Sequence, residues 1–362
     1  MTRNGLRGVR PGRDARMWTD GDGDDALPGQ PTAPGDGRRR RKRGGSERPA
    51  PDHPGDSYYG QPIINPPVWA ELDIAGYLFA GGLAGASSIL AAGADVSRRP
   101  ALARRSRLCA TAAIGTSLAA LIHDLGRPER FLNMLRVFKP TSPMSVGVWL
   151  LVFYAPLSAA AAAGDVLGVA PRATRAAGLG AGVLGSGVAT YTAALIADTA
   201  VPAWHGAHRE LPFLFAGSAA SAAAGFALVA APLHENAPAA RLAVLGSVAE
   251  LVAEQLMERR LGMVAETLHE GTAGTRLRAA KLLTALGAFG AATIAHRGRG
   301  GAAVCGGALL AGSALTRFGL FAAGMASARD PRYTVAPQRD RLRDAGRDEA
   351  RERAGTSPLE SV

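Results

Sequence analysis

The chain has only two cysteines among its 362 residues, Cys109 and Cys305, and both lie inside apolar runs. Iron–sulfur clusters and structural zinc sites need several closely spaced thiolate or imidazole ligands. Two isolated cysteines cannot supply such a set, so we expect neither kind of site here. A membrane haem would need histidines deep inside apolar segments. His123, His234 and His296 lie only at the ends of such segments, so haem is not expected either.

Charged residues are scarce in the middle of the sequence and concentrated towards its ends. The mean hydropathy of +0.05 averages polar, charged ends (residues 1–66 and 329–362) with repeated apolar runs of roughly 18–25 residues, about the length that crosses a bilayer. The net charge of +11 comes from Lys and Arg in the tails and between these runs. This pattern is typical of membrane proteins, and we do not expect nucleic-acid binding. The first 66 residues lack an apolar signal-peptide core, so the first run is expected to be an uncleaved insertion signal.

Composition divides the chain into three parts. Residues 1–56 are low in complexity and rich in Pro, Gly and Arg, which predicts a disordered, basic N-terminal tail. Its block of basic residues, 38–43, is suited to contact with anionic lipid or an acidic partner. Residues 57–328 form the predicted membrane domain, and residues 329–362 form a polar C-terminal tail.

Hydropathy predicts an all-α integral membrane protein with eight transmembrane helices. The expected spans are 69–94, 106–122, 143–163, 174–197, 212–232, 240–257, 279–296 and 301–325. An even number places both termini on one side, together with the loops 123–142, 198–211 and 258–278. These loops are rich in His, Asp, Arg, Trp and Pro, so partner docking or chemistry is expected on that side. The distribution of Lys and Arg favours a cytoplasmic location for it.

Ionisable residues within the predicted spans are few, and such residues usually face the protein interior or water because charge is costly in lipid. Those of most interest are Asp73, Glu250, Glu254, Arg317 and, directly at the end of the fourth span, Asp198. We expect Arg317 to pair with Glu250 or Glu254. The pair would either fix the register of two helices or form part of a proton path, and the residues alone do not decide between these roles.

Tyr191 lies seven residues before Asp198 in the fourth span, so the two share a helical face. A buried tyrosine hydroxyl needs a partner, which is either a neighbouring helix or a carbonyl ligand such as a quinone. Two loops on the side of the tails carry further polar residues with the chemistry for proton handling or interface contacts. They are His123, Asp124 and Arg127 in HDLGRPERF, and Trp204, His205, His208 and Arg209 after the fourth span.

Three stretches resemble the NrfD/PsrC family in the same order: PPVWAELDIAGYLFAGGLAGASSILAAGA (66–94), HDLGRPERFLNMLRVFKPTSPMSVGVW (123–149) and TYTAALIADTAVPAWHGAHRELPFLFAGSAASAAAG (190–225). These proteins are membrane subunits of polysulfide reductase, nitrite reductase and formate-dehydrogenase-type complexes, and the resemblance covers roughly residues 58–330. It implies two four-helix bundles in a bacterial plasma membrane. It also implies a quinone pocket near the docking face of a four-cluster ferredoxin-like iron–sulfur subunit, with a molybdopterin catalytic subunit beyond.

The resemblance and the buried charges together assign roles to individual residues. The quinone-binding residues are expected to be Tyr191, Asp73, Asn65 and His123. The proton-transfer residues are expected to be Asp198, Glu250, Glu254 and Arg317, and the partner-docking residues Asp124, Arg127, Trp204 and His205. The bound substrate would be a quinone, with menaquinone as the expected type, and this chain would hold no metal or haem of its own. Its function would be to pass electrons between the iron–sulfur partner and the quinone pool, as in anaerobic respiration.

Two other functions stay open from the sequence. A secondary transporter would also bury Asp, Glu and Arg, although the halves 69–197 and 212–325 show no paired Pro/Gly-broken helices of the kind transporters often contain. A purely structural membrane anchor would keep the docking loops and would tolerate the loss of Tyr191 and Asp73.

Overall fold

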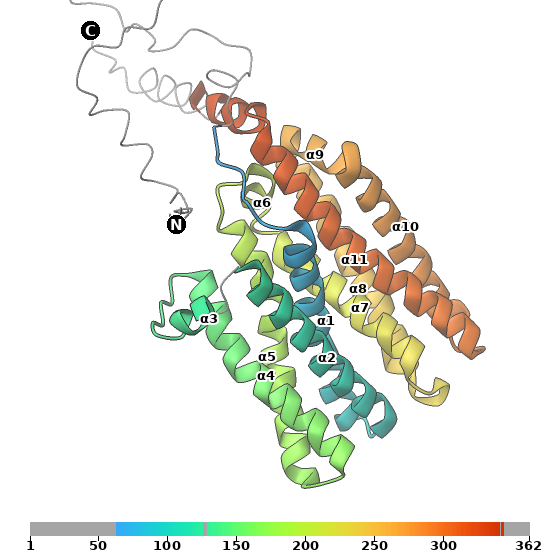
Figure 1. Ribbon diagram of the computed structural model, residues 1–362. Helices are drawn as coiled ribbons and strands as arrows, with labels where there is room; N and C mark the ends of the chain where they lie inside the picture. Colours follow the sequence, from blue (N-terminus) through green and yellow to red (C-terminus); the bar gives the residue numbers. More distant parts are fainter. Residues whose placement is uncertain (1–62, 126–128, 341, 344–362) are drawn as a thin grey trace, which may run out of the picture. The chain divides into compact units, whose positions relative to one another are not determined.

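The computed structural model describes residues 63–125, 129–340 and 342–343, and this part of the chain is almost entirely helical (Figure 1). The predicted tail over residues 1–56, Arg127 and residues 344–362 lie outside it. Eight helices in the described part are at least 20 residues long. They are α1 (Glu71–Val96), α2 (Pro100–Asp124), α4 (Pro143–Leu167), α5 (Pro171–Ala197), α7 (Leu211–Ala230), α8 (Ala237–Leu261), α10 (Gly271–Thr293) and α11 (Arg299–Arg329).

Short helical elements occupy several of the connections that were expected to be loops. They are α3 (Glu129–Met134), α6 (Pro202–Gly206), α9 (Glu266–His269), and the 3-10 turns η3 (Leu233–Glu235) and η4 (Gly262–Ala265). Residues 332–340 form a further short helix after α11. These elements were missed because hydropathy identifies apolar runs and is insensitive to short polar helices.

Five of the long helices, α1, α4, α5, α7 and α11, are long and apolar enough to cross a membrane. α2, α8 and α10 fall outside that set because polar and charged residues dilute their apolar runs. Each predicted span overlaps one long helix. The largest boundary error is in α10, which begins at Gly271 and not at 279, because its first turns, GTAGTRLR, are helical but polar.

Prolines and glycines account for many of the helix boundaries. A proline near a helix start costs nothing, because the missing N–H would have no partner inside the helix there. Six described helices carry one at the first or second position, namely α2, α4, α5, α6, α7 and α8. Gly168 directly follows α4 and Gly271 begins α10, and both glycines have a positive φ that a side chain would disfavour.

The long helices of the described chain form two groups of four, which are separated in Figure 1 by colour. In the first bundle, α1 packs against α2 and α5, and α4 packs against α5 and α2. In the second bundle, α7 packs against α8 and α11, and α10 packs against α11 and α8. Contacts of α1 with α7 and α11, and of α5 with α7, join the bundles.

Glycine pairs allow the closest helix crossings. A Cβ added at Gly85 of α1 would lie 2.4 Å from the carbonyl oxygen of Gly185 in α5. A Cβ added at Gly306 of α11 would lie 2.3 Å from the carbonyl oxygen of Gly225 in α7. Such backbone contact is typical of membrane helices, where van der Waals packing must replace the hydrophobic drive.

The ends of the helices define two faces of the helical domain. The tail face carries the start of α1, α3, α6, α9 and residues 330–340, whereas the opposite face carries the turns 97–99, 168–170, 231–236 and 294–298. Near the opposite face, Arg107 of α2 is buried between Asp95 of α1 and Asp165 of α4, with 2.7 Å between Arg107 Nη1 and Asp165 Oδ2. This cluster ties three helices of the first bundle together.

Candidate functional site

A cavity of about 220 Å³ lies in the first bundle near the tail face, between α1, α2, α4 and α5. Most of its lining is apolar, and the hydroxyl or carboxyl groups come from Tyr77, Asp124 and Tyr191. The remaining lining residues are Trp69, Ile74, Leu78, Leu121, Leu125, Met134, Met144, Val148, Leu151, Leu195 and Ile196. We call this space the Tyr191 cavity. An apolar pocket with a few convergent polar groups is the usual form of a small-molecule site.

A pair of phenols lies at the wall of the Tyr191 cavity. The hydroxyl of Tyr77 on α1 is hydrogen-bonded to the hydroxyl of Tyr191 on α5. Tyr77 is only 2% exposed, whereas Tyr191 is half-buried. Two hydroxyls that share one hydrogen bond retain a second O–H, so the more accessible Tyr191 can donate to a ligand while it accepts from Tyr77.

Small residues make the room that the Tyr191 ring occupies. Gly147 of α4 lies against this ring, and a Cβ at that position would come within 2.3 Å of Tyr191 Cε2. The orientation of the ring therefore depends on the close approach of α4 and α5. Tyr191, which the sequence singled out, does lie at a cavity wall.

Asp73 and His123 pair with each other on the tail side of the Tyr191 cavity. Asp73 Oδ2 lies 2.8 Å from His123 Nδ1, and the histidine is largely exposed. Neither residue lines the cavity directly, but each is followed in sequence by one that does, Ile74 and Asp124. Asp124, one of the predicted docking residues, lines the cavity, and its Oδ1 accepts a hydrogen bond from the Ala70 N–H.

A second, shallower cavity of about 210 Å³ adjoins the first. It shares Met134, Met144 and Val148 with the Tyr191 cavity, and it extends past Lys139, in the segment between α3 and α4, and Ser145, in the first turn of α4. Met144 is exposed on the outside of the helical domain. Met134 and Met144 therefore line both the Tyr191 cavity and the shallower cavity nearer the surface.

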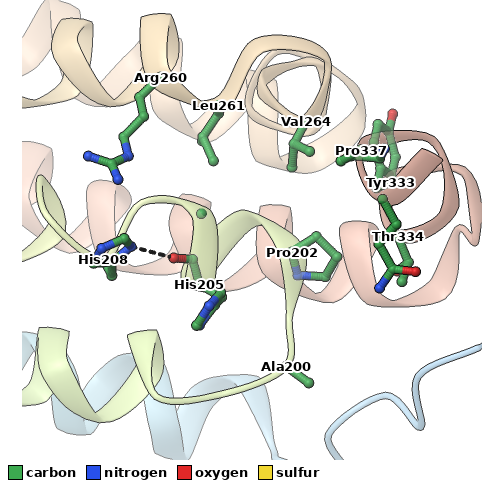
Figure 2. A pocket seen from close by; sticks show the side chains of 12 residues that line it. Ala200, Pro202, His205, His208, Arg260, Leu261, Val264, Tyr333, Thr334 and Pro337 are labelled. Carbon is green, nitrogen blue, oxygen red and sulfur yellow. Dashed lines mark hydrogen bonds between the residues drawn. The ribbon is translucent and has the colours of Figure 1, made fainter. Parts of the chain in front are cut away.

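A larger cavity of about 540 Å³, here called the His205 cavity, opens on the tail face between α6, the end of α8 and residues 333–338. Figure 2 shows Arg260 extending towards it from α8, with His205 and His208 across the space. His208 Nδ1 lies 3.0 Å from the carbonyl oxygen of His205. Arg260 also pairs with Glu210, at 3.2 Å between Nη1 and Oε1. Burial raises the pKa of the Tyr333 phenol at the edge of this cavity, outside the long helices.

Trp204 is not a docking residue of the isolated chain, contrary to expectation, because it is only 1% exposed. Its Nε1 donates to the carbonyl oxygen of Leu320 at 2.9 Å, and its ring stacks on Trp69 with centroids 5.9 Å apart. Trp69 lines the Tyr191 cavity and His205 lines the His205 cavity. Because Trp204 directly precedes His205 in α6, the Trp69–Trp204 stack links the linings of the two cavities, and we call it the Trp69–Trp204 wall.

The remaining predicted residues are more scattered. Asn65 is exposed in the segment before α1 and is absent from the cavity lining that the described residues form. Asp198 is exposed at the C-terminal end of α5, on the tail face. Arg127 falls outside the described residues. His205 is exposed and lines the His205 cavity, as a contact residue would.

Arg317 makes no direct ion pair with a glutamate among the described residues, although Glu250 lies close enough to interact with its charge. Arg317 Nη2 donates to the carbonyl oxygen of Phe215 at 2.9 Å, and its guanidinium lies 3.6 Å from the centre of the Phe215 ring. Glu250 accepts from the Thr316 hydroxyl at 2.8 Å, and Glu254 pairs with Lys281 at 3.5 Å. Lys281 lies within the predicted span 279–296 and was not considered as a partner for the glutamates.

Sequence reasoning missed Tyr77, Glu258 and Lys281. Tyr77 lies inside the stretch YLFAGG and one turn after Asp73, so a tyrosine hydroxyl in an otherwise small and apolar segment was the available signal. Glu258 continues the four-residue spacing of Glu250 and Glu254. Among the described residues, no group of three or more His, Cys, Asp or Glu side chains is arranged to hold a metal ion.

Comparison with known proteins places the chain in a family. The family described as "Polysulphide reductase, NrfD" matches residues 62–265, which is more than half of the chain and includes both cavities' main helices. The search of curated proteins gave no significant match. The matched region contains the Tyr77–Tyr191 pair, the Asp73–His123 pair and α6. The chain therefore belongs to the NrfD family and is a multi-pass membrane subunit of the polysulfide reductase type.

Proposed function

We propose that this chain is the quinone-reacting membrane subunit of a multi-subunit oxidoreductase, and that the head group of the quinone binds in the Tyr191 cavity. The observation that carries the proposal is the Tyr77–Tyr191 pair at the wall of an apolar cavity inside an NrfD-family chain. The His205 cavity is larger, but its lining is more polar and it opens on the tail face. A lipid-soluble ligand would reach the Tyr191 cavity from the bilayer.

The lining fits a quinone head group. At about 220 Å³ the cavity is somewhat below the range of about 300–1,000 Å³ for whole-ligand pockets. It therefore suits a ring rather than a long isoprenoid chain. Met134, Met144 and Val148 would accommodate the start of that chain on the way to the surface, and methionine adapts readily to flexible ligands. Menaquinone is the expected type.

Quinone reduction or oxidation exchanges two electrons and two protons with its surroundings. The Tyr191 hydroxyl would donate a hydrogen bond to a carbonyl oxygen of the ring, and Tyr77 would hold that hydroxyl in place. Asp73 and His123, paired at 2.8 Å on the tail side, would exchange protons between the cavity and the aqueous phase. Asp198 lies on the same face and would extend this exchange.

The partners would dock on the tail face. A four-cluster iron–sulfur subunit over the His205 cavity would be separated from the Tyr191 cavity by the Trp69–Trp204 wall. His205, His208 and Arg260 offer this partner hydrogen-bond donors and positive charge. Electrons would then pass between that subunit and the quinone pool, with a molybdopterin subunit as the catalytic partner. We also propose a cytoplasmic tail face in a bacterial plasma membrane.

All eight long helices would cross the bilayer, including the three with less apolar composition. On α8, Leu245, Val248, Val252 and Leu256 are each at least 50% exposed, at helical spacing along one stripe. On α10, Leu282, Leu286 and Phe289 are each at least 64% exposed. On α8 and α10 the outward face is apolar and the face towards the bundle carries charged groups, whereas a helix of a water-soluble protein has the opposite arrangement. This arrangement favours contact with lipid.

The test compares Tyr191→Phe with Tyr154→Phe in the purified complex. Tyr154 lies in the same bundle and also loses a hydroxyl hydrogen bond, which it makes to Ser88 at 2.8 Å, but it is absent from the cavity lining. A neutral hydrogen bond is worth about 0.5–1.5 kcal/mol, so Tyr191→Phe should lower quinone-dependent kcat/KM roughly two- to tenfold. Equal quinone kinetics in both variants, with the partner subunits retained, would favour a structural anchor.

A further inference from the structure

The second bundle contains a row of charged side chains that takes no part in the Tyr191 cavity. Glu250, Glu254 and Glu258 follow one another at four-residue spacing on α8, so they lie on one face of that helix. Lys281 of α10 bridges the last two, with its Nζ 3.5 Å from Glu254 Oε1 and 2.6 Å from Glu258 Oε1. His269 of α9 continues the row, at 3.8 Å between its Nε2 and Glu258 Oε2.

Exposure of the histidine and the three glutamates falls from the tail face inwards, whereas Lys281, which bridges two of them, is 36% exposed. The side chain of His269 is 53% exposed and that of Glu258 is 22% exposed. The side chain of Glu254 is 6% exposed, and Glu250 is 2% exposed. Glu250 lies about 16 Å along α8 from its tail-face end, given a rise of about 1.5 Å per residue. The row therefore connects the aqueous tail face with the middle of the bilayer.

The inner end of the row has unsatisfied polar atoms. Glu250 Oε2, Arg317 Nε and Arg317 Nη1 are buried and make no hydrogen bond to any group in the described chain. Buried polar atoms without a partner are rare and costly. The free acceptor on Glu250 and the free donors on Arg317 leave room for an additional hydrogen bond or proton at this carboxyl group. Such an arrangement is suited to proton exchange. Hydroxyls of Thr316, Ser218 and Ser221 surround the same carboxyl.

Between Glu250 and the opposite face, the buried interior changes to alanine and leucine. The cluster there consists of Leu90, Ala94, Leu102, Ala103, Ala224, Ala227, Leu228, Ala231, Ala239, Ala243, Ala291, Ala295, Ala302 and Leu309. Each is at most 7% exposed. Buried polar residues beside this layer include Glu235 and Asn236, in the turn at the opposite face. Glu235 accepts from the Leu102 N–H, and Asn236 donates to the Leu228 carbonyl oxygen. The alanine and leucine side chains between that turn and Glu250 cannot themselves carry a proton.

We infer that the second bundle is a proton half-channel, open to the tail face through His269, Glu258, Lys281 and Glu254, ending at Glu250 and Arg317, and closed to the opposite face by the alanine–leucine layer. The inference depends on the membrane placement of α8 and α10 but not on quinone binding in the Tyr191 cavity. It assigns a direction to these carboxylates, because protons reach Glu250 from the tail side only. A proton passes along the row between carboxyl and amine groups, with no redox step.

The test measures modification of Glu250 by dicyclohexylcarbodiimide, a membrane-soluble reagent that reacts with protonated carboxyl groups. The complete protein is reconstituted in liposomes of known orientation, the pH is set separately on each side, and the labelled peptide is quantified by mass spectrometry. Raising the pH on the tail side should abolish labelling of Glu250, and raising it on the opposite side should leave labelling unchanged. Wild-type protein suffices for this comparison, so no variant needs to fold.

Two variants sharpen the result. Glu254→Leu should remove the response of Glu250 to the tail-side pH, because it interrupts the row. Glu235→Gln is the matched control at the opposite face. It keeps the acceptor for the Leu102 N–H at 2.7 Å and should preserve the response. Labelling that follows the pH of the opposite side, or of neither side, would overturn the half-channel. Quinone kinetics of Tyr191→Phe test the Tyr191 cavity separately, so the two proposals can fail independently.

Discussion

The crossing of α1 and α5 should control both the stability of the first bundle and the geometry of its phenol pair. In Gly85→Ala, the new Cβ would lie 2.4 Å from the Gly185 carbonyl oxygen and 2.8 Å from the Ala189 nitrogen. Ordinary contacts begin at 3.4 Å, so the two helices would have to separate by about 1 Å because the interior is close-packed. Overpacking of this kind costs about 1–3 kcal/mol.

Gly93→Ala on the same helix is the control for this prediction. A Cβ at Gly93 would meet no atom within 4 Å, so the substitution should stabilise α1 by about 0.5–1 kcal/mol through reduced backbone freedom. Thermal unfolding in nanodiscs should show opposite shifts, with about 2–4 °C in Tm for each kcal/mol. Because Tyr77 and Tyr191 belong to the same two helices, Gly85→Ala should also raise the KM for quinone. Equal Tm values for the two variants would refute the argument that backbone contact limits this crossing.

Two further substitutions test other parts of the fold. Arg107→Leu should lower stability by about 3 kcal/mol, because it leaves the largely enclosed carboxylates of Asp95 and Asp165, 14% and 18% exposed, without their cation. The drop in Tm should be largely reversed by adding Asp165→Asn, and an unchanged Tm for the single variant would contradict the role of this cluster. Trp204→Ala should cost about 3–5 kcal/mol by removing a buried ring and its stack on Trp69. An unchanged unfolding midpoint of this variant in denaturant would show that the Trp69–Trp204 stack contributes nothing to the stability of the protein.

The sequence predicted what depends on composition and on recognisable motifs. It identified the helical membrane domain, Tyr191 as a residue at a cavity, and the three stretches that match the family now confirmed over residues 62–265. It could not predict which side chains meet across helices. Tyr77 was overlooked because a hydrogen bond between α1 and α5 depends on helix rotation, which hydropathy does not determine.

The errors have the same physical origin. Arg317 was paired with a glutamate because charge balance in lipid requires compensation, yet its guanidinium is held by the Phe215 ring and carbonyl group. Trp204 was placed at a surface because loop tryptophans often mark interfaces, whereas α6 folds it inwards against α11. For Arg317 and Trp204 alike, the sequence indicated the chemical preference of the side chain but not which neighbouring residues would satisfy it.

The central claim is that a quinone head group binds beside Tyr191, and photo-crosslinking tests it most directly. The complete membrane complex would be irradiated with a photoreactive quinone analogue, and the labelled peptides would be mapped. The account predicts labelling in the segments around Met144–Leu151 and Tyr191–Ile196, which line the cavity, and loss of this labelling when menaquinone is added in excess. Labelling confined to the lipid-exposed stripes of α8 and α10, or labelling that menaquinone does not displace, would contradict it.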